Sequence, residues 1–313
     1  MQRVERVVLA IDIGGTKMAC GLVTADGELL ASERITTPRS DDADVLFGAL
    51  EQACRRVIGT HAAQPLAIGV GCGGPMRYPE GIVNPVNIHA WREFPLRERL
   101  STAFELPCTV DNDAKALAVA ERWRGAGQGA NNMLGMVVST GVGGGIILDG
   151  QLLHGETGNA GHVGHIIVWP DGPPCGCGAR GCVEGIASGS GLARRVGAAL
   201  AEGRPTILGP DATAADVAVA ARGGDLLAQE LYCTAGDAVG RGIASAAAVL
   251  DLERVVIGGS IALLAWDLLG PPLEAEVRAR ARLDFTRNLK VVRAELGDQA
   301  GLFGAAQLAL ALL

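Results

Sequence analysis

The sequence lacks three features that mark large classes of proteins. It has no surplus of basic residues, because 27 Lys and Arg stand against 34 Asp and Glu and give a net charge of −7. That balance argues against a protein that binds nucleic acid through a general basic surface. No uncharged apolar run reaches the roughly 20 residues of a membrane span, and no secretory leader precedes the first apolar stretch. We therefore expect a cytoplasmic protein with no nucleic-acid or membrane partner.

The composition excludes disorder as a description of the whole chain. Hydrophobic residues make up 49% of the 313 residues and charged residues 19%, and a chain of this length is expected to form two domains. The 45 glycines are about twice the usual share and, without a collagen period, indicate turns and close backbone approaches. In a cytosolic chain the eight cysteines favour metal ligands or free thiols over a disulfide framework.

The sequence contains a repeat, with one copy in residues 7–30 and the other in residues 133–153. Each copy has the pattern of a buried strand, a glycine-rich turn, a second strand, an Asp-Gly hairpin and a short third strand. Two similar α/β lobes explain this pattern, and chance is the alternative because Asp-Gly hairpins are common. Apolar spacing predicts a strand at 254–257 and helices at 44–58, 114–123, 192–201, 214–222, 226–250 and 304–313.

The two glycine-rich turns are candidates for binding phosphate. In Asp12–Lys17, adjacent glycines let backbone amides face an anion, Thr16 and Lys17 add a hydroxyl and a charge, and Asp12 could hold the water shell of Mg²⁺. The turn is neither a Walker A loop nor a Rossmann motif, and the plain alternative is a tight hairpin with a solvated Lys17. The turn at 139–145 repeats the pattern, so we expect both lobes to hold one polyphosphate.

A third motif, Asp111–Asp113, stands at a predicted junction of strand and helix. A carboxylate there suits a general base that accepts the proton of an attacking alcohol, as a kinase requires. An ordinary helix N-cap fits the same position.

The cysteine-rich segment is the most specific motif. Cys175, Cys177 and Cys182 lie within eight residues, and His165 precedes them by ten. Three Cys and one His supply the four ligands of a closed, structural Zn²⁺ site, and unrelated free thiols are the alternative. The other cysteines are predicted mostly for the core: Cys20, Cys54, Cys72, Cys108 and Cys233.

Several polar residues are candidates for binding a polyol, which needs directional donors and acceptors. They are Asn87, His162, His165 and Glu184. For any one of them a solvated or capping role is the alternative. His89 and Trp91 are predicted to pack within their loop.

Taken together, these motifs resemble the ROK family of bacterial sugar kinases and repressors. Asp12–Lys17 is similar to the family's first phosphate motif, 139–145 to its second, and the segment from Cys175 to Glu184 to its zinc motif. The resemblance covers the chain from Val7 to the C-terminal helix. It implies a two-lobed, actin-like ATPase fold of the ribonuclease H type, with a small lobe at 1–118 completed by 301–313 and a larger lobe at 119–300. It also implies a homodimer or homotetramer.

The resemblance further implies transfer of the γ-phosphoryl group of ATP to a sugar hydroxyl, usually on C6, with Asp113 as the catalytic base. The implied substrate positions are Gly74, Asn87, Asn112, Asp113, His162, His165 and Glu184. The implied positions for ATP and Mg²⁺ are Asp12, Gly14, Gly15, Thr16, Lys17, Thr140, Gly141, Gly143, Gly258 and Gly259. The implied ligands of the structural Zn²⁺ are His165, Cys175, Cys177 and Cys182, and His165 is expected to turn its other ring nitrogen to the sugar.

The chain departs from the family pattern at two positions. Many family glucokinases have Glu where this chain has His162, whereas N-acetylmannosamine kinases of the family look similar in having His there. Neutral His offers one donor and one acceptor, while ionised Glu only accepts, so His162 is expected to act on recognition near C1 or C2 of the sugar. Lys115 stands where a neutral residue is common, and we expect it to be a solvated helix position.

Four functions fit the motifs. They are a kinase for glucose or a close relative, a kinase for an amino sugar or a sugar-like cyclitol, a sugar-responsive repressor, and a catalytically silent sugar sensor. A repressor is expected to have a helix-turn-helix before the first strand, and only six residues precede Val7. Asp113 and the two glycine turns argue against the silent sensor.

Overall fold

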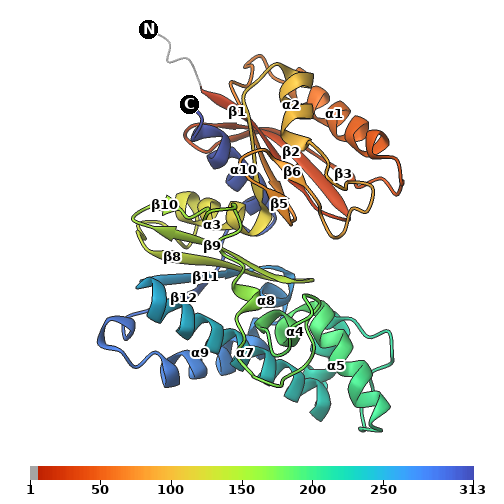
Figure 1. The fold of residues 1–313 in the computed structure, drawn as a ribbon, viewed down its shortest axis with the longest axis vertical. Coiled ribbons are helices and arrows are strands. Elements are labelled where there is room, and N and C mark those ends of the chain that lie inside the picture. The colour runs from red at the N-terminus through yellow and green to blue at the C-terminus, as the bar shows by residue number, and fades with distance from the viewer. Residues whose placement is uncertain (1–5) are drawn as a thin grey trace. The chain divides into compact units, whose positions relative to one another are not determined.

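The computed structural model describes residues 6–313, which form two compact units. The first contains the described residues up to Gln128 together with Leu152–Ala160 and Glu295–Leu313, and the second contains Gly129–Gln151 and Gly161–Ala294 (Figure 1). The first unit continues past residue 118 because helix α3 (Asp113–Arg124) runs through that position. Residues before 301 also belong to it, since its last segment begins at Glu295.

The sheet of the first unit has the strand order β3-β2-β1-β4-β7. β1 pairs antiparallel with β2, and β2 antiparallel with β3, while β1, β4 and β7 run parallel. The strands are β1 (Val7–Ile13), β2 (Lys17–Thr24), β3 (Leu29–Thr36), β4 (Ile68–Cys72) and β7 (Cys108–Asn112). A small separate hairpin pairs β5 (Met76–Arg77) with β6 (Ile82–Val83).

The sheet of the second unit has the matching order β10-β9-β8-β11-β12. Again the pair that flanks the glycine turn, β8 and β9, is antiparallel, and the strands that follow in the sheet, β11 and β12, run parallel to β8. The strands are β8 (Met133–Val138), β9 (Val142–Leu148), β10 (Gln151–Leu152), β11 (Arg254–Gly258) and β12 (Lys290–Arg293). The repeat expected from the sequence is therefore present in the topology.

Both faces of the first sheet are buried. Along β1, Leu9 and Ile11 belong to the apolar cluster with helix α1 (Ala43–Gly59), while Val8 and Ala10 belong to the cluster with α10 (Ala300–Leu310). This alternation follows from the two-residue period of a strand. α3 packs against α10, and α2 (Leu96–Phe104) packs beside β7.

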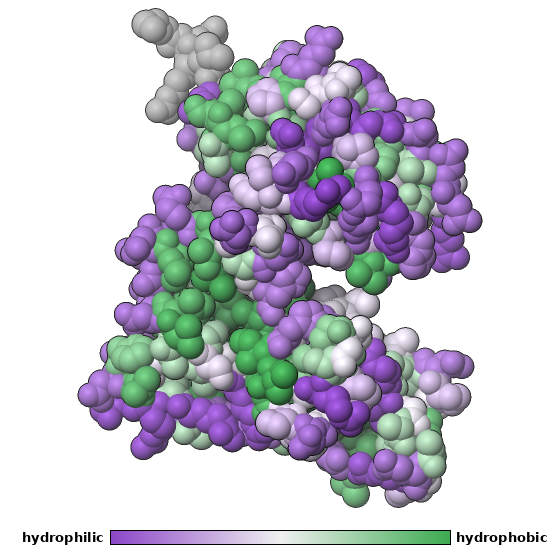
Figure 2. Space-filling view, in the orientation of Figure 1, coloured by the Kyte–Doolittle hydropathy of each residue, from purple (hydrophilic) through white to green (hydrophobic). Residues whose placement is uncertain are grey.

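The second unit has one large apolar core between its sheet and its helices. The helices are α4 (Val183–Ala187), α5 (Gly189–Ala201), α6 (Ala214–Arg222), α7 (Leu226–Leu250), α8 (Ser260–Leu264) and α9 (Trp266–Arg280). Short 3₁₀ turns occupy Val163–His165 and Asp284–Thr286 in this unit, and Gly297–Gln299 in the first unit. On the face drawn in Figure 2, hydrophilic residues cover much of the surface and hydrophobic ones gather in separate patches. Within residues 6–313, no helix combines the length and apolar character that crossing a bilayer requires.

Helix α10 lies very close to its neighbours in the first unit. A Cβ added to Gly69 of β4 would collide with the carbonyl oxygen of Ala305, and one added to Gly304 would collide with the backbone of Ala116. These positions require glycine because no flexible side chain is available to move aside.

We expect Gly304→Ala to destabilise the protein by about 1–3 kcal/mol, because the added methyl group overpacks the contact between α10 and α3. Urea unfolding followed by circular dichroism measures this change. Gly48→Ala in α1 is the matched control, since a Cβ there meets nothing within 4 Å and alanine favours a helix by about 0.5–1 kcal/mol. Equal stability of the two variants would contradict the packing argument.

Candidate functional site

The first glycine turn closes between β1 and β2. The Gly14 amide donates to the Lys17 carbonyl oxygen at 2.9 Å, and the Thr37 hydroxyl donates to the Gly14 carbonyl oxygen at 2.8 Å. Gly15, Thr16 and Lys17 are exposed at the tip. The Lys17 ammonium lies 3.8 Å from an Asp298 carboxylate oxygen, and both side chains are largely exposed. The turn is thus held by its ends while its tip stays open.

The carboxyl ends of β1, β4 and β7 bring most of the predicted first-unit residues together. A Cβ on Gly71 would lie 3.8 Å from both the Cα of Asp113 and an oxygen of Asp12, and one on Gly74 would lie 3.4 Å from the Asn112 amide nitrogen. A Cβ on Gly15 would lie 2.5 Å from that of Asn87. Asp12, Gly14, Gly15, Gly74, Asn87, Asn112 and Asp113 therefore occupy one edge of this sheet.

The helix cap that competed with a catalytic role belongs to Asn112. Its side-chain oxygen accepts from the Ala114 amide at 3.0 Å, and its backbone is extended, as an N-cap requires. Asp113 is the first helical residue and is exposed, and one of its oxygens also lies 2.8 Å from the Ala114 amide. Since Asn112 already caps the helix, capping does not by itself explain a carboxylate at Asp113.

Asp12 is in an environment that disfavours its charge. Burial is the main cause and the nearby carboxylate of Asp113 the second, and together they raise the pKa of Asp12 to about 6. Burial, with the same two carboxylates, also raises the pKa of the Cys72 thiol at the end of β4. A cation bound at this edge would relieve the repulsion between the carboxylates.

The second glycine turn lies between β8 and β9 in the second unit. The Ser139 amide donates to the Gly141 carbonyl oxygen at 2.9 Å, which closes the turn. The Gly189 amide, at the start of α5, donates to the Ser139 carbonyl oxygen at 2.8 Å, and the Ser139 and Ser260 hydroxyl oxygens lie 2.9 Å apart. Gly259 has a φ of +94° and directs the chain from β11 into α8. The turn therefore meets the starts of α5 and α8.

A mostly apolar cavity of about 650 Å³ opens beside this turn. Thr140 of the turn lines it, as do Gly189 and Ala193 of α5. The rest of its lining comes from the segments 210–222 and 260–265, with Tyr232 of α7. A cavity of this size, lined in part by a glycine turn, suits a flat apolar ring attached to a phosphate chain.

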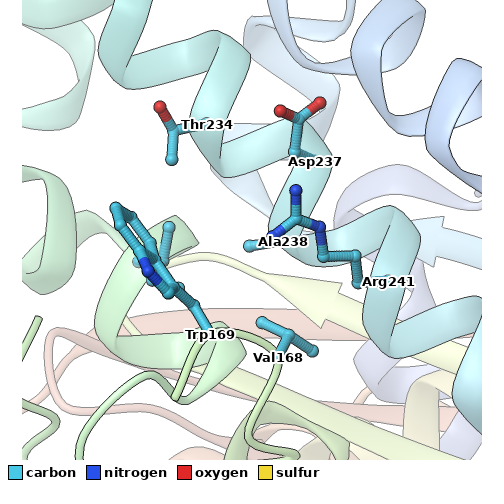
Figure 3. A pocket seen from close by; sticks show the side chains of 7 residues that line it. Val168, Trp169, Thr234, Asp237, Ala238 and Arg241 are labelled. Carbon is cyan, nitrogen blue, oxygen red and sulfur yellow. The ribbon is translucent and has the colours of Figure 1, made fainter. Parts of the chain in front are cut away.

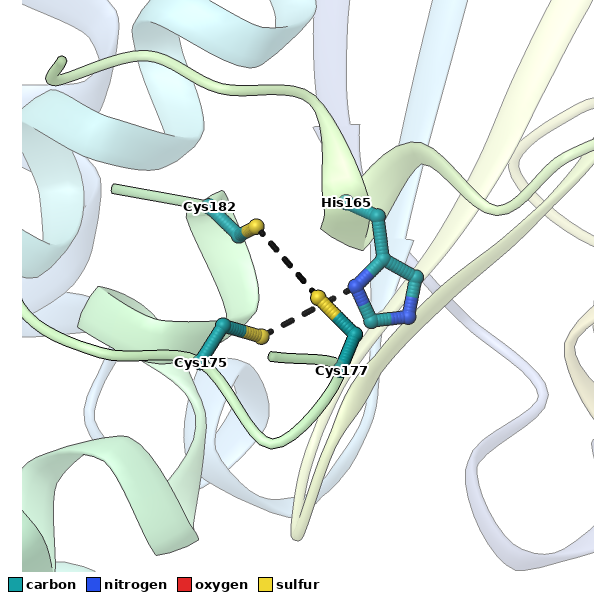
Figure 4. A group of neighbouring side chains, drawn as sticks. All are labelled: His165, Cys175, Cys177 and Cys182. Atoms are coloured by element: carbon teal, nitrogen blue, oxygen red, sulfur yellow. Dashed lines mark hydrogen bonds between the residues drawn. The ribbon is translucent and has the colours of Figure 1, made fainter. Parts of the chain in front are cut away.

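The predicted metal ligands converge in the second unit. The ligand atoms of His165, Cys175, Cys177 and Cys182 all lie within 4.8 Å of one another (Figure 4). The Cys177 and Cys182 sulfurs are 3.8 Å apart, which matches the edge of about 3.8 Å of a tetrahedron with bonds of about 2.3 Å from zinc to sulfur. His165 turns its Nδ1 toward the Cys175 sulfur, 3.8 Å away.

Glu184 connects the cysteine cluster with the second glycine turn. One carboxylate oxygen accepts from the Val142 amide at 2.9 Å, and the other lies 3.7 Å from the Cys175 sulfur. A Cβ on Gly141 would lie 2.8 Å from the first of these oxygens. The ring of His162, which is exposed, lies 6.0 Å from that of His165, measured between centroids. The predicted sugar contacts of the second unit thus adjoin its cluster of three cysteines and His165.

A second, smaller cavity of about 240 Å³ lies in the second unit (Figure 3). Trp169 and Asp237 line it, with Arg241 on α7. It contains none of the residues predicted from the motifs. Its lining is connected to the cysteine segment, because the Val168 amide donates at 2.9 Å to the carbonyl oxygen of Gly181, next to Cys182. The fluorescence of Trp169 can therefore report a change in that segment.

The expectation of a solvated Lys115 is wrong. Its side chain is 1% exposed, and its ammonium lies 3.2 Å from Asp111 and donates at 2.7 Å to the Gly158 carbonyl oxygen. Asp111 is also fully buried, and its second oxygen lies 3.0 Å from His154 Nδ1. The sequence signal that could have shown this ion pair was the spacing of four residues between Asp111 and Lys115.

Trp91 is buried as predicted, and of the five scattered cysteines only Cys233 is exposed.

The structure as a whole is similar to solved sugar-kinase structures. A ROK family glucokinase from Streptomyces griseus, solved in complex with glucose and AMPPNP, matches with a TM-score of 0.80 and 33% identity over 97% of this chain and 99% of that one. The repeated sheets are those of the actin-like ATPase fold, and the chain is a carbohydrate kinase of that fold.

Comparison of the sequence with known proteins identifies the family of this chain. Residues 8–311 match the model of the ROK family. A glucokinase from Halalkalibacterium halodurans is 36% identical over 96% of this chain and 94% of its own length. An N-acetylmannosamine kinase from Yersinia pseudotuberculosis is 37% identical over 97% of this chain and 99% of its own length. The chain belongs to the ROK family.

We expect Asp12→Asn to raise the melting temperature near neutral pH while leaving it little changed near pH 4. The folded-state pKa of Asp12 is raised from 3.8 to about 6. Ionisation of Asp12 is therefore less favourable in the folded than in the unfolded chain, and the free energy of unfolding falls as pH rises from about 4 to 6. The asparagine variant does not bear that cost. Thermal unfolding across this range measures the difference, with exposed Asp26→Asn as the control. A difference that shrinks with rising pH would contradict the assignment.

Proposed function

We propose that this protein transfers the terminal phosphoryl group of ATP to the primary, C6-type hydroxyl of a hexose, with glucose the first candidate acceptor. The observation that supports this most is the exposed Asp113 carboxylate, which stands at the same sheet edge as Asn87 and the first glycine turn. The glucokinase relative and the structure that holds glucose and AMPPNP favour the same activity.

Asp113 is assigned as the general base that accepts the proton of the attacking hydroxyl. Phosphoryl transfer asks for little covalent chemistry from the protein, so positioning and charge stabilisation provide most of the catalysis. Asn87 and Asn112, with the backbone at Gly74, are assigned to hold the sugar beside this base. In the second unit His162, His165 and Glu184 are assigned to sugar hydroxyls.

The nucleotide is assigned to the two glycine turns. Gly14, Gly15, Thr16 and Lys17 supply amides, a hydroxyl and an ammonium to the phosphates, and Thr140, Gly141 and Gly143 supply a second set. The cavity of about 650 Å³ beside Thr140 would take the adenosine, with Gly258 and Gly259 at the end of β11. Mg²⁺ would neutralise phosphate charge, and Asp12, whose charge is disfavoured without a cation, is the residue that fits it.

The four-residue cluster fits a structural Zn²⁺. Its donor set of three thiols and one imidazole is typical of closed zinc sites, and its ligand atoms already lie within 4.8 Å of one another. The ion would fix the ring of His165 and, through the Cys175 segment, the position of Glu184. His165 has its Nδ1 toward the cysteines, which leaves Nε2 for a sugar hydroxyl.

The second candidate acceptor is an amino sugar, of which N-acetylmannosamine is the first example, or a sugar-like cyclitol. His162 favours this alternative, because a neutral imidazole both donates and accepts where a carboxylate only accepts. The N-acetylmannosamine kinase relative is as similar to the chain as the glucokinase is.

An assay of ADP release over glucose, mannose, N-acetylglucosamine, N-acetylmannosamine, aminoglucoses and cyclitols tests the function. We expect one clear preferred acceptor, and with it Asp113→Asn is expected to lower kcat by about 10²–10⁴-fold while the sugar still binds. Asp26→Asn, in the hairpin at the opposite end of β2, is the control. No turnover with any acceptor would refute a kinase, and near-parental kcat in Asp113→Asn would refute the assigned base.

The zinc assignment is tested by elemental analysis. We expect about one Zn²⁺ per purified chain, and a large loss of it in Cys177→Ser. The variant is also expected to lose activity and to shift the fluorescence of Trp169, whose amide donates to the carbonyl oxygen of Gly181 at 3.3 Å. Cys233→Ser is the matched control, since Cys233 is exposed and outside the cluster. A metal-free parent with full activity would contradict the assignment.

A further inference from the structure

We propose that Lys115 and Asp111 form a buried pair that positions the catalytic base, Asp113, and that Lys115 is a positioning residue of this chain. The inference rests on the proposed function, because it takes Asp113 as the base. The pair belongs neither to the glycine turns nor to the cysteine cluster, so the proposed function gives it no role of its own.

The pair brackets the base in the sequence. Asp111 precedes Asp113 by two residues at the end of β7, and Lys115 follows it by two in the first turn of α3. The Lys115 ammonium lies 3.2 Å from one Asp111 oxygen, and the same oxygen accepts from the Asn112 amide at 2.7 Å. The strand end and the first helical turn are thus joined on both sides of Asp113.

The pair is also anchored to a distant part of the same unit. Lys115 donates to the Gly158 carbonyl oxygen at 2.7 Å. The second Asp111 oxygen lies 3.0 Å from His154 Nδ1, and neither atom has a hydrogen-bonding partner elsewhere among residues 6–313. The rings of His154 and Tyr78 stack at 4.3 Å between centroids with 9° between their planes. The segment that carries His154 and Gly158 therefore holds the pair from outside both β7 and α3.

Stability alone does not account for two buried charges at this place. Both side chains are 1% exposed, and desolvating a pair of ions often costs as much as their attraction returns. Apolar residues of similar volume would serve a core as well or better. What the charged pair adds is direction, since the ammonium must satisfy Asp111 and the Gly158 carbonyl oxygen at once.

Position matters here because Asp113 is the first residue of α3 and therefore moves with the junction between β7 and α3. A general base must lie within hydrogen-bonding reach of the hydroxyl, and a misplacement of about 1 Å can cost a reaction on the order of 10²-fold. Loosening the junction between β7 and α3 is thus expected to lower kcat while contacts that bind the sugar and the nucleotide remain.

The test compares Lys115→Met, Asp111→Asn and the double variant that carries both substitutions. Each single change leaves one partner unmatched, so Lys115→Met is expected to lower the melting temperature, and the double variant, which removes both charges, is expected to recover most of the loss. A merely structural pair would then recover kcat as well. We expect kcat of the double variant to stay at least about tenfold below the parent, with KM for sugar and ATP within about threefold.

The control is Glu274→Gln with Arg278→Met, an exposed pair of the same spacing on α9, which should leave kcat unchanged. A double variant with parental stability and parental kcat would overturn the positioning role while leaving the proposed function intact. If the double variant does not fold, Asp111→Asn alone decides, and parental kcat in that variant has the same meaning. An inactive parent overturns the proposed function, and the positioning role with it.

Discussion

The parallel pairing of β1, β4 and β7 is the constraint on which the first-unit site depends. The register places Ile13 beside Cys72 and Cys72 beside Asn112, so the polar residues that adjoin these strand ends emerge at one edge. Asp12, Gly74 and Asp113 come from segments about 60 and 40 residues apart, and only this ladder brings them together. The second sheet repeats the device, because Gly258 pairs with Val137 just before the turn at 139–145.

The charges at that edge fall into two groups. Asp12 and Asp113 repel each other, and the repulsion contributes to the raised pKa of Asp12. Asp111 is matched by the buried Lys115 and contacts His154. The first group can take up a cationic partner, whereas the second holds its geometry without one.

Local sequence pattern was sufficient to predict much of the structure. The repeat, the glycine turns and the cysteine cluster are all encoded within short windows, and the predicted helices at 44–58, 214–222 and 226–250 agree with α1, α6 and α7. Helix α9 was not predicted, because Pro271 and Pro272 lie inside it and proline ordinarily ends a helix. It persists through packing on α7, where a Cβ on Gly236 would lie 2.5 Å from Pro272. Lys115 was misjudged for a similar reason, since its partner Gly158 is 43 residues away.

The last helix has a consequence for how the protein is made. α10 belongs to the first unit and packs against β1, β4 and α3, whereas the second unit ends at Ala294. A chain emerging from the ribosome therefore exposes an unfinished apolar sheet until α10 has been synthesised. Although domains usually fold in the order of synthesis, here the first unit is completed only after the second.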